Sequence, residues 1–475
     1  MRPAITVDPT AATPIHRQIY DAWRAGVLAG RFRGGSRVPS TRELAVTLAV
    51  ARSTVSQAYE QLIAEGYLQS THGSGTFVCR ELPDQLLRTR PVPATRSAGA
   101  APIRLSRFGA GLRDDFPRRP RLAGHIDLSY WGPDLAQFPF ALWRKLLLRH
   151  MRKFDPALFD YAEKSHGYEP LRQEIAAYAA RSRAVRCTPE QVIVVNGSQQ
   201  ALELCARLFL EPGDQVAFEN PGYLGTRHIM SAYRARLLPT RVDAEGIVVA
   251  DVAKNARLVY VTPSHQFPTG VVLSLARRLA LIEWARGNRA VIVEDDYDSE
   301  YRYSGPPLPA MQGLAADAPV VYCGTFSKVM FPALRIGYVI VPPSLVDVFA
   351  RAKWLTDRHT PLLEQAVLTD FLSEGHLDRH IRRMRRHYGR RREVLAEALD
   401  RHFGAGAQTT GDPAGMHMLV RFDDAAVRER AAANKVQLAD AGTYYLTKPP
   451  RNEFVLGFSA LGERTIREGI KRLAR

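Results

Sequence analysis

The spacing of hydrophobic and polar positions differs between the two ends of the chain. Between residues 13 and 79 apolar side chains recur at helical intervals, and Val55, Tyr59 and Leu62, for example, fall on one helix face. From residue 125 onward, short β-rich runs such as QVIVVN, RLVYVT and RAVIVED alternate with helix-compatible segments. Strands that alternate with helices predict a largely parallel sheet that is buried on both faces.

The segment between these two regions has a composition of its own. Residues 80–124 are rich in Arg, Pro, Ala and Gly and show no sustained period, which is typical of a flexible basic linker. We therefore expect a helical unit with a glycine-rich tail at 13–79, a linker at 80–124 and an α/β unit at 125–475.

Two short helices are expected between Pro39 and Tyr67, joined by a tight turn at Val50–Ala51. Ser40 is followed three residues later by a glutamate, the pattern of a capping box at the start of the first helix. Ser53 is placed to cap the second helix. The buried stripe of that second helix is expected to comprise Val55, Ala58, Tyr59, Leu62 and Ile63.

The N-terminal end of the second helix is polar, as in a recognition helix that enters the major groove of DNA. The side chains available there are those of Arg52, Ser53, Thr54 and Gln57. After Gly66, YLQSTHGSGTFV predicts two strands around a glycine-rich tip, as in a wing. Spacing alone leaves a second interpretation open, an ordinary pair of helices followed by a β-hairpin.

The stretch RQIYDAW…GRFRGGSRVPSTRELAVTLAVARSTVSQAYEQLIAEGYLQSTHGSGTFV resembles the GntR-type winged helix over nearly its whole length. This resemblance implies binding to double-stranded DNA. It implies DNA contacts by Arg42, Arg52 and Thr54, and backbone contacts by the wing at His72 and Gly73.

A single lysine stands in the small and apolar stretch GTFSKVMFPALRIGY. The amine of a lysine has a pKa of about 10.4 in water, so Lys328 is a poor nucleophile unless it is desolvated or paired with a cofactor carbonyl. A lysine that binds pyridoxal 5′-phosphate as a Schiff base needs three companions: a carboxylate for the ring nitrogen, a stacking aromatic ring and an anion site for the phosphate.

Candidates for all three companions occur in the α/β region. VIVED ends a buried strand at Asp295, and Tyr297 follows it. ENPGY supplies the aromatic ring of Tyr223. VIVVNGSQQAL predicts a strand that turns into a helix at residues 197–199, where free backbone N–H groups attract a phosphate. Arg335 lies seven residues after the lysine and can pair with the same phosphate.

Residues 125–475 resemble the class I aminotransferases, the fold-type I family of pyridoxal-phosphate enzymes, and the whole chain resembles the MocR/GabR subfamily of GntR regulators. Matching stretches include NGSQQALEL, VEDDYDSEYRY and GTFSKVMFPALRIGY. The resemblance implies a winged helix-turn-helix, then an α/β domain with a mostly parallel sheet and a smaller C-terminal α+β subdomain. It also implies a homodimer.

The resemblance assigns a role to each candidate residue around the cofactor. Lys328 would form the Schiff base, Asp295 would pair with the pyridine nitrogen, Tyr297 would bond to the cofactor's phenolic oxygen and Tyr223 would stack on the ring. The phosphate would be held by Ser198, Gln199, Ser327, Arg335 and Thr325, and by Tyr161 across the dimer.

Two positions depart from the pattern of the enzymes. Phe267 in HQFPTG stands where aminotransferases carry an Asn that bonds to the cofactor, and His265 or Gln266 could replace that Asn. In EFVLGFSAL, Val455 stands where an Arg grips the substrate carboxylate, and a valine cannot form that bidentate pair. Either another cation grips the effector's acid group, with Arg227 and Arg358 as candidates, or the effector is not a simple α-amino acid.

Composition narrows the class of protein. The formal net charge of the 475 residues is +17, which suits a polyanionic partner such as nucleic acid; arginine usage in a high-GC organism is the alternative explanation. The four cysteines are scattered without a Cys/His cluster, so we expect no metal site and a reducing compartment. No apolar run reaches about 18 residues, so we expect a cytoplasmic protein without membrane contact.

Together these observations predict a DNA-binding transcriptional regulator that senses an amino compound, or pyridoxal phosphate itself, through an aldimine at Lys328. The alternative is an active aminotransferase fused to a DNA-binding domain. Residues that hold the cofactor do not separate the two, but the missing carboxylate-binding arginine favours the regulator over the enzyme.

Overall fold

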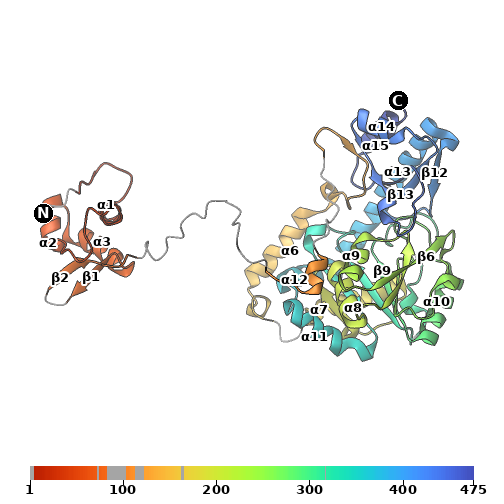
Figure 1. Cartoon of the computed structure of the whole chain (residues 1–475), viewed down its shortest axis with the longest axis horizontal. Coiled ribbons are helices and arrows are strands. Elements are labelled where there is room, and N and C mark those ends of the chain that lie inside the picture. Colours follow the sequence, from red (N-terminus) through yellow and green to blue (C-terminus); the bar gives the residue numbers. More distant parts are fainter. Residues whose placement is uncertain (1–4, 72–73, 83–102, 113–121, 162–164, 316) are drawn as a thin grey trace. The chain divides into compact units, whose positions relative to one another are not determined.

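The computed structural model describes residues 5–71, 74–82, 103–112, 122–161, 165–315 and 317–475. The chain divides into two compact units, Met1–Ile103 and Arg104–Arg475. Figure 1 shows the elements of both units, coloured along the sequence.

The first unit consists of helices followed by a β-hairpin. Its elements are α1 (Ile15–Leu28), α2 (Thr41–Leu48), α3 (Arg52–Ala64), β1 (Leu68–Thr71) and β2 (Gly75–Val78). The hairpin is antiparallel, with Leu68 opposite Val78. Trp23 of α1 lies at the centre of the buried core, where its ring contacts those of Phe32 and Tyr59. This is a helix-turn-helix with a wing.

The predicted start of α2 is confirmed. The Ser40 side chain accepts from the Glu43 backbone N–H at 3.2 Å, and the Glu43 carboxylate accepts from the Ser40 N–H at 2.8 Å. This capping box satisfies backbone donors that the first helical turn leaves without partners.

Two predictions about α3 are wrong. The N-cap is Ala51, with no side-chain cap, because the helix begins at Arg52 and Ser53 is already inside its first turn. Ile63 is 37% exposed, whereas the buried stripe consists of Val55, Ala58, Tyr59 and Leu62. The stripe ends at Leu62 because the next residue is rotated by about 100° around the helix, towards solvent.

A mixed, mostly parallel sheet forms the centre of the second unit. In the described part of the chain its strand order is β4-β11-β10-β9-β8-β5-β6-β7. Strands β10, β9, β8, β5 and β6 run parallel, whereas β11 is antiparallel to both of its neighbours and β7 is antiparallel to β6. The strands are β4 (Val192–Val195), β5 (Gln215–Asn220), β6 (Arg236–Asp243), β7 (Gly246–Ile247), β8 (Leu258–Val261), β9 (Val291–Asp296), β10 (Val320–Thr325) and β11 (Gly337–Ile340).

Helices cover both faces of this sheet. Alternate residues of one strand enter different cores: Ile193 packs with residues of α8, α9 and α11, whereas Val192 packs with residues of α7, α12 and α13. Helix α10 covers the face that carries Val259 and Ile292. These helices are α7 (Glu169–Arg183), α8 (Ser198–Phe209), α9 (Leu224–Ala232), α10 (Leu275–Asn288), α11 (Val346–Asp357), α12 (Leu362–Ser373) and α13 (His376–Phe403).

The remaining elements precede the sheet or follow it. Before it come α5 (Arg107–Gly111), β3 (Ile126–Asp127) and α6 (Phe140–Lys153). The C-terminal part, blue in Figure 1, carries an antiparallel sheet with the order β12-β13-β16-β15, and β14 pairs with β3. Its elements are β12 (Ala407–Thr410), β13 (His417–Phe422), α14 (Val427–Ala433), β14 (Val436–Gln437), β15 (Ala439–Asp440), β16 (Glu453–Gly457) and α15 (Glu463–Leu473).

Long apolar helices do not occur in the parts of the chain that the structure describes: none of the helices there could cross a membrane.

Candidate functional site

The candidate residues of the second unit gather at one edge of the sheet. Strands β4, β5, β8, β9 and β10 all end there, because β4 and β10 are both antiparallel to β11 and the others run parallel to β10. In open α/β sheets, ligands bind outside the carboxyl ends of the strands. Asp295 is close to the end of β9, and Lys328 follows the end of β10 by three residues.

Lys328 is desolvated and lies over an aromatic ring. Its Nζ is 4.5 Å from the centre of the Tyr130 ring. Burial lowers the pKa of this amine, because the charged form loses its hydration, and the carboxylates of Asp298 and Asp295 oppose that shift. A lysine with a lowered pKa has a larger fraction of neutral, nucleophilic amine.

Asp295 is a buried carboxyl group that is only partly satisfied. Its Oδ2 accepts a hydrogen bond from the Tyr260 hydroxyl at 2.7 Å, while its Oδ1 finds no partner among the described residues. Burial raises its pKa to about 6, and the hydrogen bond from Tyr260 and the charge of Lys328 act in the opposite direction. An unpartnered buried carboxylate oxygen costs free energy, which a bound cation or N–H donor would offset.

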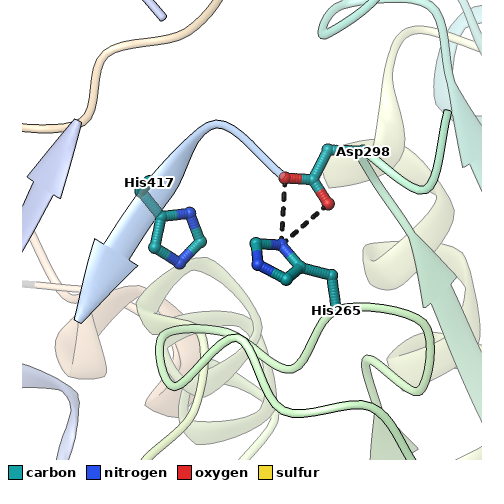
Figure 2. A group of neighbouring side chains, drawn as sticks. All are labelled: His265, Asp298 and His417. Atoms are coloured by element: carbon teal, nitrogen blue, oxygen red, sulfur yellow. Dashed lines mark hydrogen bonds and ion pairs between the residues drawn. The ribbon is translucent and has the colours of Figure 1, made fainter. Parts of the chain in front are cut away.

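Tyr297, His265, Asp298 and His417 form a polar cluster beside Lys328. The Tyr297 hydroxyl donates to the His265 carbonyl at 2.9 Å and lies 3.0 Å from His265 Nδ1. The same Nδ1 faces both oxygens of Asp298 at 3.1 Å, and the His417 ring faces the His265 ring, as Figure 2 shows. Any residue other than glycine at position 415 would clash with this cluster, since a Cβ there would lie 1.9 Å from His265 Cε1.

Tyr223 is the N-cap residue of α9, so the start of that helix fixes the position of its ring. The ring meets the edge of Phe267 at 5.8 Å between centroids. Burial raises the pKa of Tyr223 to about 12, and Asp295 adds to the shift while Arg335 opposes it. The hydroxyl is therefore neutral at physiological pH.

Gly197, Ser198 and Arg335 form a second polar group. Ser198 is the first residue of α8, after Gly197 at φ +78°. Arg335 Nη2 donates to the Asn196 carbonyl at 2.9 Å, and a Cβ on Gly197 would lie 3.0 Å from that nitrogen. The strand register brings the end of β10, just before Lys328, level with the end of β4, just before this turn. Thr325 pairs with Gly337, and Gly337 pairs with Val195. A helix N-terminus next to a guanidinium is suited to an anion.

The remaining predicted phosphate residues differ in how exposed they are. Thr325 is buried and its Oγ1 accepts from the Ser327 backbone N–H at 3.2 Å. Gln199, in the first turn of α8, is exposed. Tyr161 is 72% exposed, and its ring contacts Arg358 and His359 instead of the residues around Lys328. Its role at a partner subunit stays a prediction.

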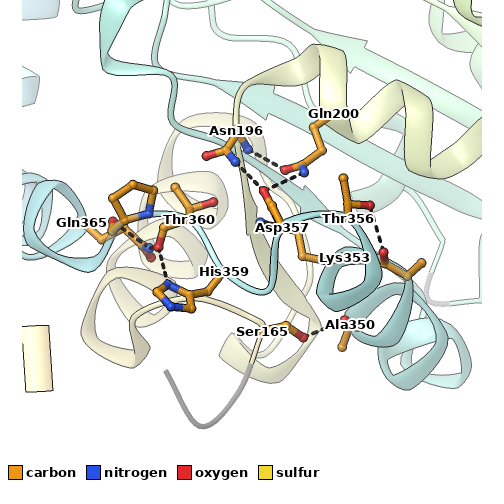
Figure 3. Close-up of polar contacts among 12 residues, drawn as sticks. Ser165, Asn196, Gln200, Ala350, Lys353, Thr356, Asp357, His359, Thr360 and Gln365 are labelled. Carbon is orange, nitrogen blue, oxygen red and sulfur yellow. Dashed lines mark hydrogen bonds and ion pairs between the residues drawn. The ribbon is translucent and has the colours of Figure 1, made fainter. Parts of the chain in front are cut away.

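A polar brace holds the turn before α8 in place. Asp357 accepts hydrogen bonds from the side-chain amides of Asn196 and Gln200 and from Lys353 Nζ, the last at 2.6 Å (Figure 3). Gln200 in turn accepts from the Asn196 backbone N–H at 2.8 Å. The brace ties the turn to α11, and the opposite side of the turn is held by Arg335.

In the first unit, the predicted DNA contacts lie at the start of α3 and on α2. Arg42, Arg52, Ser53 and Gln57 are exposed, and Thr54 is half-buried. Arg42 and Arg52 line one open groove between the two helices, and Arg52 Nε bonds to Thr41 Oγ1 at 3.3 Å. His72 and Gly73 lie outside the described residues.

Comparison with known proteins connects both units to families. The model for bacterial regulatory proteins of the gntR family matches residues 15–78, and that for aminotransferases of class I and II matches residues 157–472. The kynurenine aminotransferase of Pyrococcus horikoshii, solved with PMP, is 31% identical with a TM-score of 0.69, over 74% of this chain and 90% of that one.

Several regulators match nearly the whole chain, and two of them serve as examples. The probable rhizopine catabolism regulatory protein MocR of Rhizobium meliloti is 39% identical over 99% of this chain and 95% of its own length. The pyridoxine biosynthesis regulator PdxR of Corynebacterium glutamicum is 30% identical over 98% and 96%. This chain belongs to the MocR-type family of GntR transcriptional regulators. Its first unit is the DNA-binding domain of that family, and its second is the aminotransferase-like domain.

Phe267, one of the departures from the enzyme pattern, lies among aromatic rings in this MocR-type chain. Phe267 is buried, and its ring contacts those of Tyr130, Tyr223 and Tyr297. Of the two suggested substitutes for the missing Asn, His265 contacts Tyr297, whereas Gln266 bonds to the Pro221 carbonyl and to Glu219.

Sequence reasoning missed three residues of the site, namely Tyr130, Asp298 and His417. Asp298 belongs to the quoted stretch VEDDYDSEY and was one residue from a predicted contact. Tyr130 and His417 come from segments far from Lys328 in the sequence, and no local pattern marks them. The structure brings the three together because β13, which begins at His417, lies beside the edge where β9 and β10 end.

Proposed function

We propose that this MocR-type regulator holds pyridoxal 5′-phosphate at Lys328 and changes its DNA binding when an amine-bearing effector, or the cofactor itself, enters that site. The observation that carries the proposal is the joint position of Lys328, Asp295 and the Gly197–Arg335 anion site at one edge of the sheet. A homodimer is part of the proposal, by analogy with the family.

The residues present fit this cofactor. The unpartnered Oδ1 of Asp295 would accept a hydrogen bond from the pyridine N–H. Tyr223 would stack on the face of the ring, and Tyr297 would bond to the phenolic oxygen of the cofactor. Ser198, Ser327 and Arg335 would hold the phosphate, with the backbone N–H groups at the start of α8. The cofactor supplies an aldehyde that condenses reversibly with primary amines.

A variant of Lys328 tests the cofactor half of the proposal. The purified full-length protein with added pyridoxal 5′-phosphate should show the absorption band of a lysine-bound cofactor, and Lys328→Ala should lose that band. Lys328→Arg, which keeps the positive charge but cannot condense with the aldehyde, should lose it as well. An unchanged band in either variant contradicts the assignment of Lys328.

A variant of Arg52 tests the DNA half. Arg52→Ala should weaken binding to a duplex of the protein's own promoter region by about tenfold, because one contact to a base or phosphate is worth about 1–3 kcal/mol. The cofactor band should stay unchanged. An unchanged DNA affinity would remove Arg52 from the list of contacts, and parallel loss of DNA binding and of the band would indicate misfolding.

The runner-up function is an active aminotransferase fused to a DNA-binding domain, since Lys328, Asp295 and Tyr223 fit this function as well as the regulator. Incubation with amino acids and a keto-acid acceptor separates the two functions. Turnover of many equivalents per protein would support the enzyme, whereas binding without turnover supports the regulator.

A further inference from the structure

One wall of the site is apolar where an amino-acid enzyme would carry a cation. Val455, in β16, is fully buried in a cluster with Phe267, Leu419 and Tyr444. Tyr223 and Tyr297, the two tyrosines next to the proposed cofactor, pack against the same cluster. A carboxylate that approached this wall would lose its hydration without gaining a partner there.

The two arginines that could take over the role of a carboxylate clamp are engaged elsewhere. Arg227 Nη1 donates to the backbone carbonyls of Thr443 at 3.4 Å and Tyr445 at 3.2 Å. The guanidinium of Arg358 lies 4.6 Å from the ring centre of Tyr161 and 5.5 Å from that of Trp354.

The buried charges near Lys328 also disfavour a carboxylate. Asp298 is almost completely buried, and its charge raises the pKa of Lys328 and of the Tyr130 hydroxyl. A second acid, Asp295, acts on Lys328 in the same direction. Because like charges repel strongly in a medium of low dielectric constant, these two carboxylates disfavour an anion beside Lys328, while burial still keeps the pKa of the lysine below its usual value.

The polar cluster beside Lys328 contains an unpartnered hydrogen-bond acceptor, Nδ1 of His417. His417 Nε2 lies 3.2 Å from the Pro268 carbonyl, which can only accept, so this nitrogen carries the proton. Burial, His265 and Lys328 hold the pKa of His417 well below its usual value, so the ring is neutral and Nδ1 bears a lone pair. That Nδ1 is buried and has no partner among the described residues, as is also true of the adjacent Tyr130 hydroxyl.

We infer that the effector is a primary amine that has no carboxylate on its amine-bearing carbon and that carries a hydroxyl group, which donates to His417 Nδ1. An amino alcohol or amino sugar has this chemistry. The inference rests on the proposed function, because it names the class of effector for the same site. It makes Val455 and His417 the residues that determine specificity.

A matched series of three amines tests this inference. L-Alanine, L-alaninol and 2-aminopropane share the methyl group and the amine-bearing carbon, and differ in carrying a carboxylate, a hydroxymethyl or a second methyl group. Dissociation constants are measured on the cofactor-loaded full-length protein from its absorption spectrum and by calorimetry, and are expressed for the neutral amine. We expect L-alaninol to bind at least tenfold more tightly than L-alanine, with 2-aminopropane between them.

Each alternative result has a distinct meaning. L-Alanine binding as tightly as L-alaninol or more tightly overturns the inference, since a clamp for the carboxylate, supplied by this chain or by a partner subunit, would then exist. Equal affinities of L-alaninol and 2-aminopropane overturn the assignment of a hydroxyl to His417. If no spectrum that depends on Lys328 is obtained, the proposed function fails before the series is run.

A substitution at Val455 gives a second test with a matched control. Val455→Arg would place a guanidinium on this wall, and the affinity for L-alanine should rise at least tenfold relative to L-alaninol. Val455→Leu, which keeps the wall apolar, should leave the ratio as in the natural protein. Thermal melting with each amine, with and without cofactor, supplies a second readout, and a shift that persists without cofactor contradicts binding at this site. Should Val455→Arg fail to fold, the three-amine series decides alone.

Discussion

The two ends of the Lys328 site differ in how they are built. The end at Gly197 and Arg335 uses backbone N–H groups and a guanidinium, held by the brace around Asp357. The other end consists of Val455, Phe267 and aromatic rings, with one acceptor nitrogen on His417. The first end offers groups that attract an anion, and the second offers apolar side chains and one hydrogen-bond acceptor. Under the proposed function, the first end would hold the cofactor and the second would select the amine.

The largest expected effect comes from the anion end. Arg335→Ala should weaken the affinity for pyridoxal 5′-phosphate by about 100-fold, because charge-assisted hydrogen bonds to one guanidinium are worth about 3 kcal/mol. The order of affinities among amines should stay the same. Equilibrium dialysis of the cofactor measures the first quantity and spectral titration the second.

Gly197→Ala is a second test of the anion end, and Arg386→Ala is the control. A Cβ at Gly197 meets the Arg335 guanidinium and is strained at φ +78°, so Gly197→Ala should also weaken cofactor binding. Arg386 is exposed on α13, where it lines a surface with Arg379, Arg382 and Arg385, and its variant should bind the cofactor normally. An Arg335→Ala variant that changed amine preference instead of cofactor affinity would contradict the division into two ends.

A smaller effect is expected for Asp295→Asn. The substitution should stabilise the cofactor-free protein but weaken the binding of the cofactor. The pKa of Asp295 in the folded protein without cofactor is about 6, above the 3.8 of an unperturbed carboxyl group. A raised carboxyl pKa destabilises the fold above pH 6, and the cost disappears as the pH falls below about 4. Asp295→Asn should therefore stabilise the cofactor-free protein at pH 8 by up to about 3 kcal/mol, and by much less at pH 4.5.

The same Asp295→Asn variant should bind the cofactor more weakly, since an amide cannot neutralise a protonated ring nitrogen. Denaturant unfolding at the two pH values, with and without cofactor, measures both effects. Equal stability changes at pH 8 and pH 4.5 would show that the buried charge is not their source.

The smallest effect is expected at the apolar end. His417→Phe keeps a flat ring in the same place and removes the acceptor, so L-alaninol should lose about two- to tenfold in affinity, the worth of one neutral hydrogen bond. The affinity for 2-aminopropane and for the cofactor should stay the same. If 2-aminopropane loses as much as L-alaninol, His417 acts through packing and not as an acceptor.

The sequence predicted features that depend on neighbouring residues better than features that depend on contacts between distant segments. The capping box at Ser40 and the alternation of strands and helices depend on neighbouring residues, and both predictions are confirmed. Ile63 was assigned to the wrong face because a stripe that fits helical spacing leaves its outermost member undecided. Tyr130 and His417 could not be predicted, because their place beside Lys328 depends on how distant segments meet at the edge of the sheet.

The most direct measurement is the affinity of the full-length protein for a duplex of its own promoter region, with and without pyridoxal 5′-phosphate and L-alaninol, compared between the natural protein and Lys328→Ala. Fluorescence anisotropy of the labelled duplex reports it. The proposal predicts that the cofactor or the amine changes the DNA affinity of the natural protein, and that Lys328→Ala still binds the duplex but no longer responds. An identical response in Lys328→Ala, or no response in the natural protein to the cofactor or to any amine of the series, would contradict the proposal that Lys328 links the cofactor site to DNA binding.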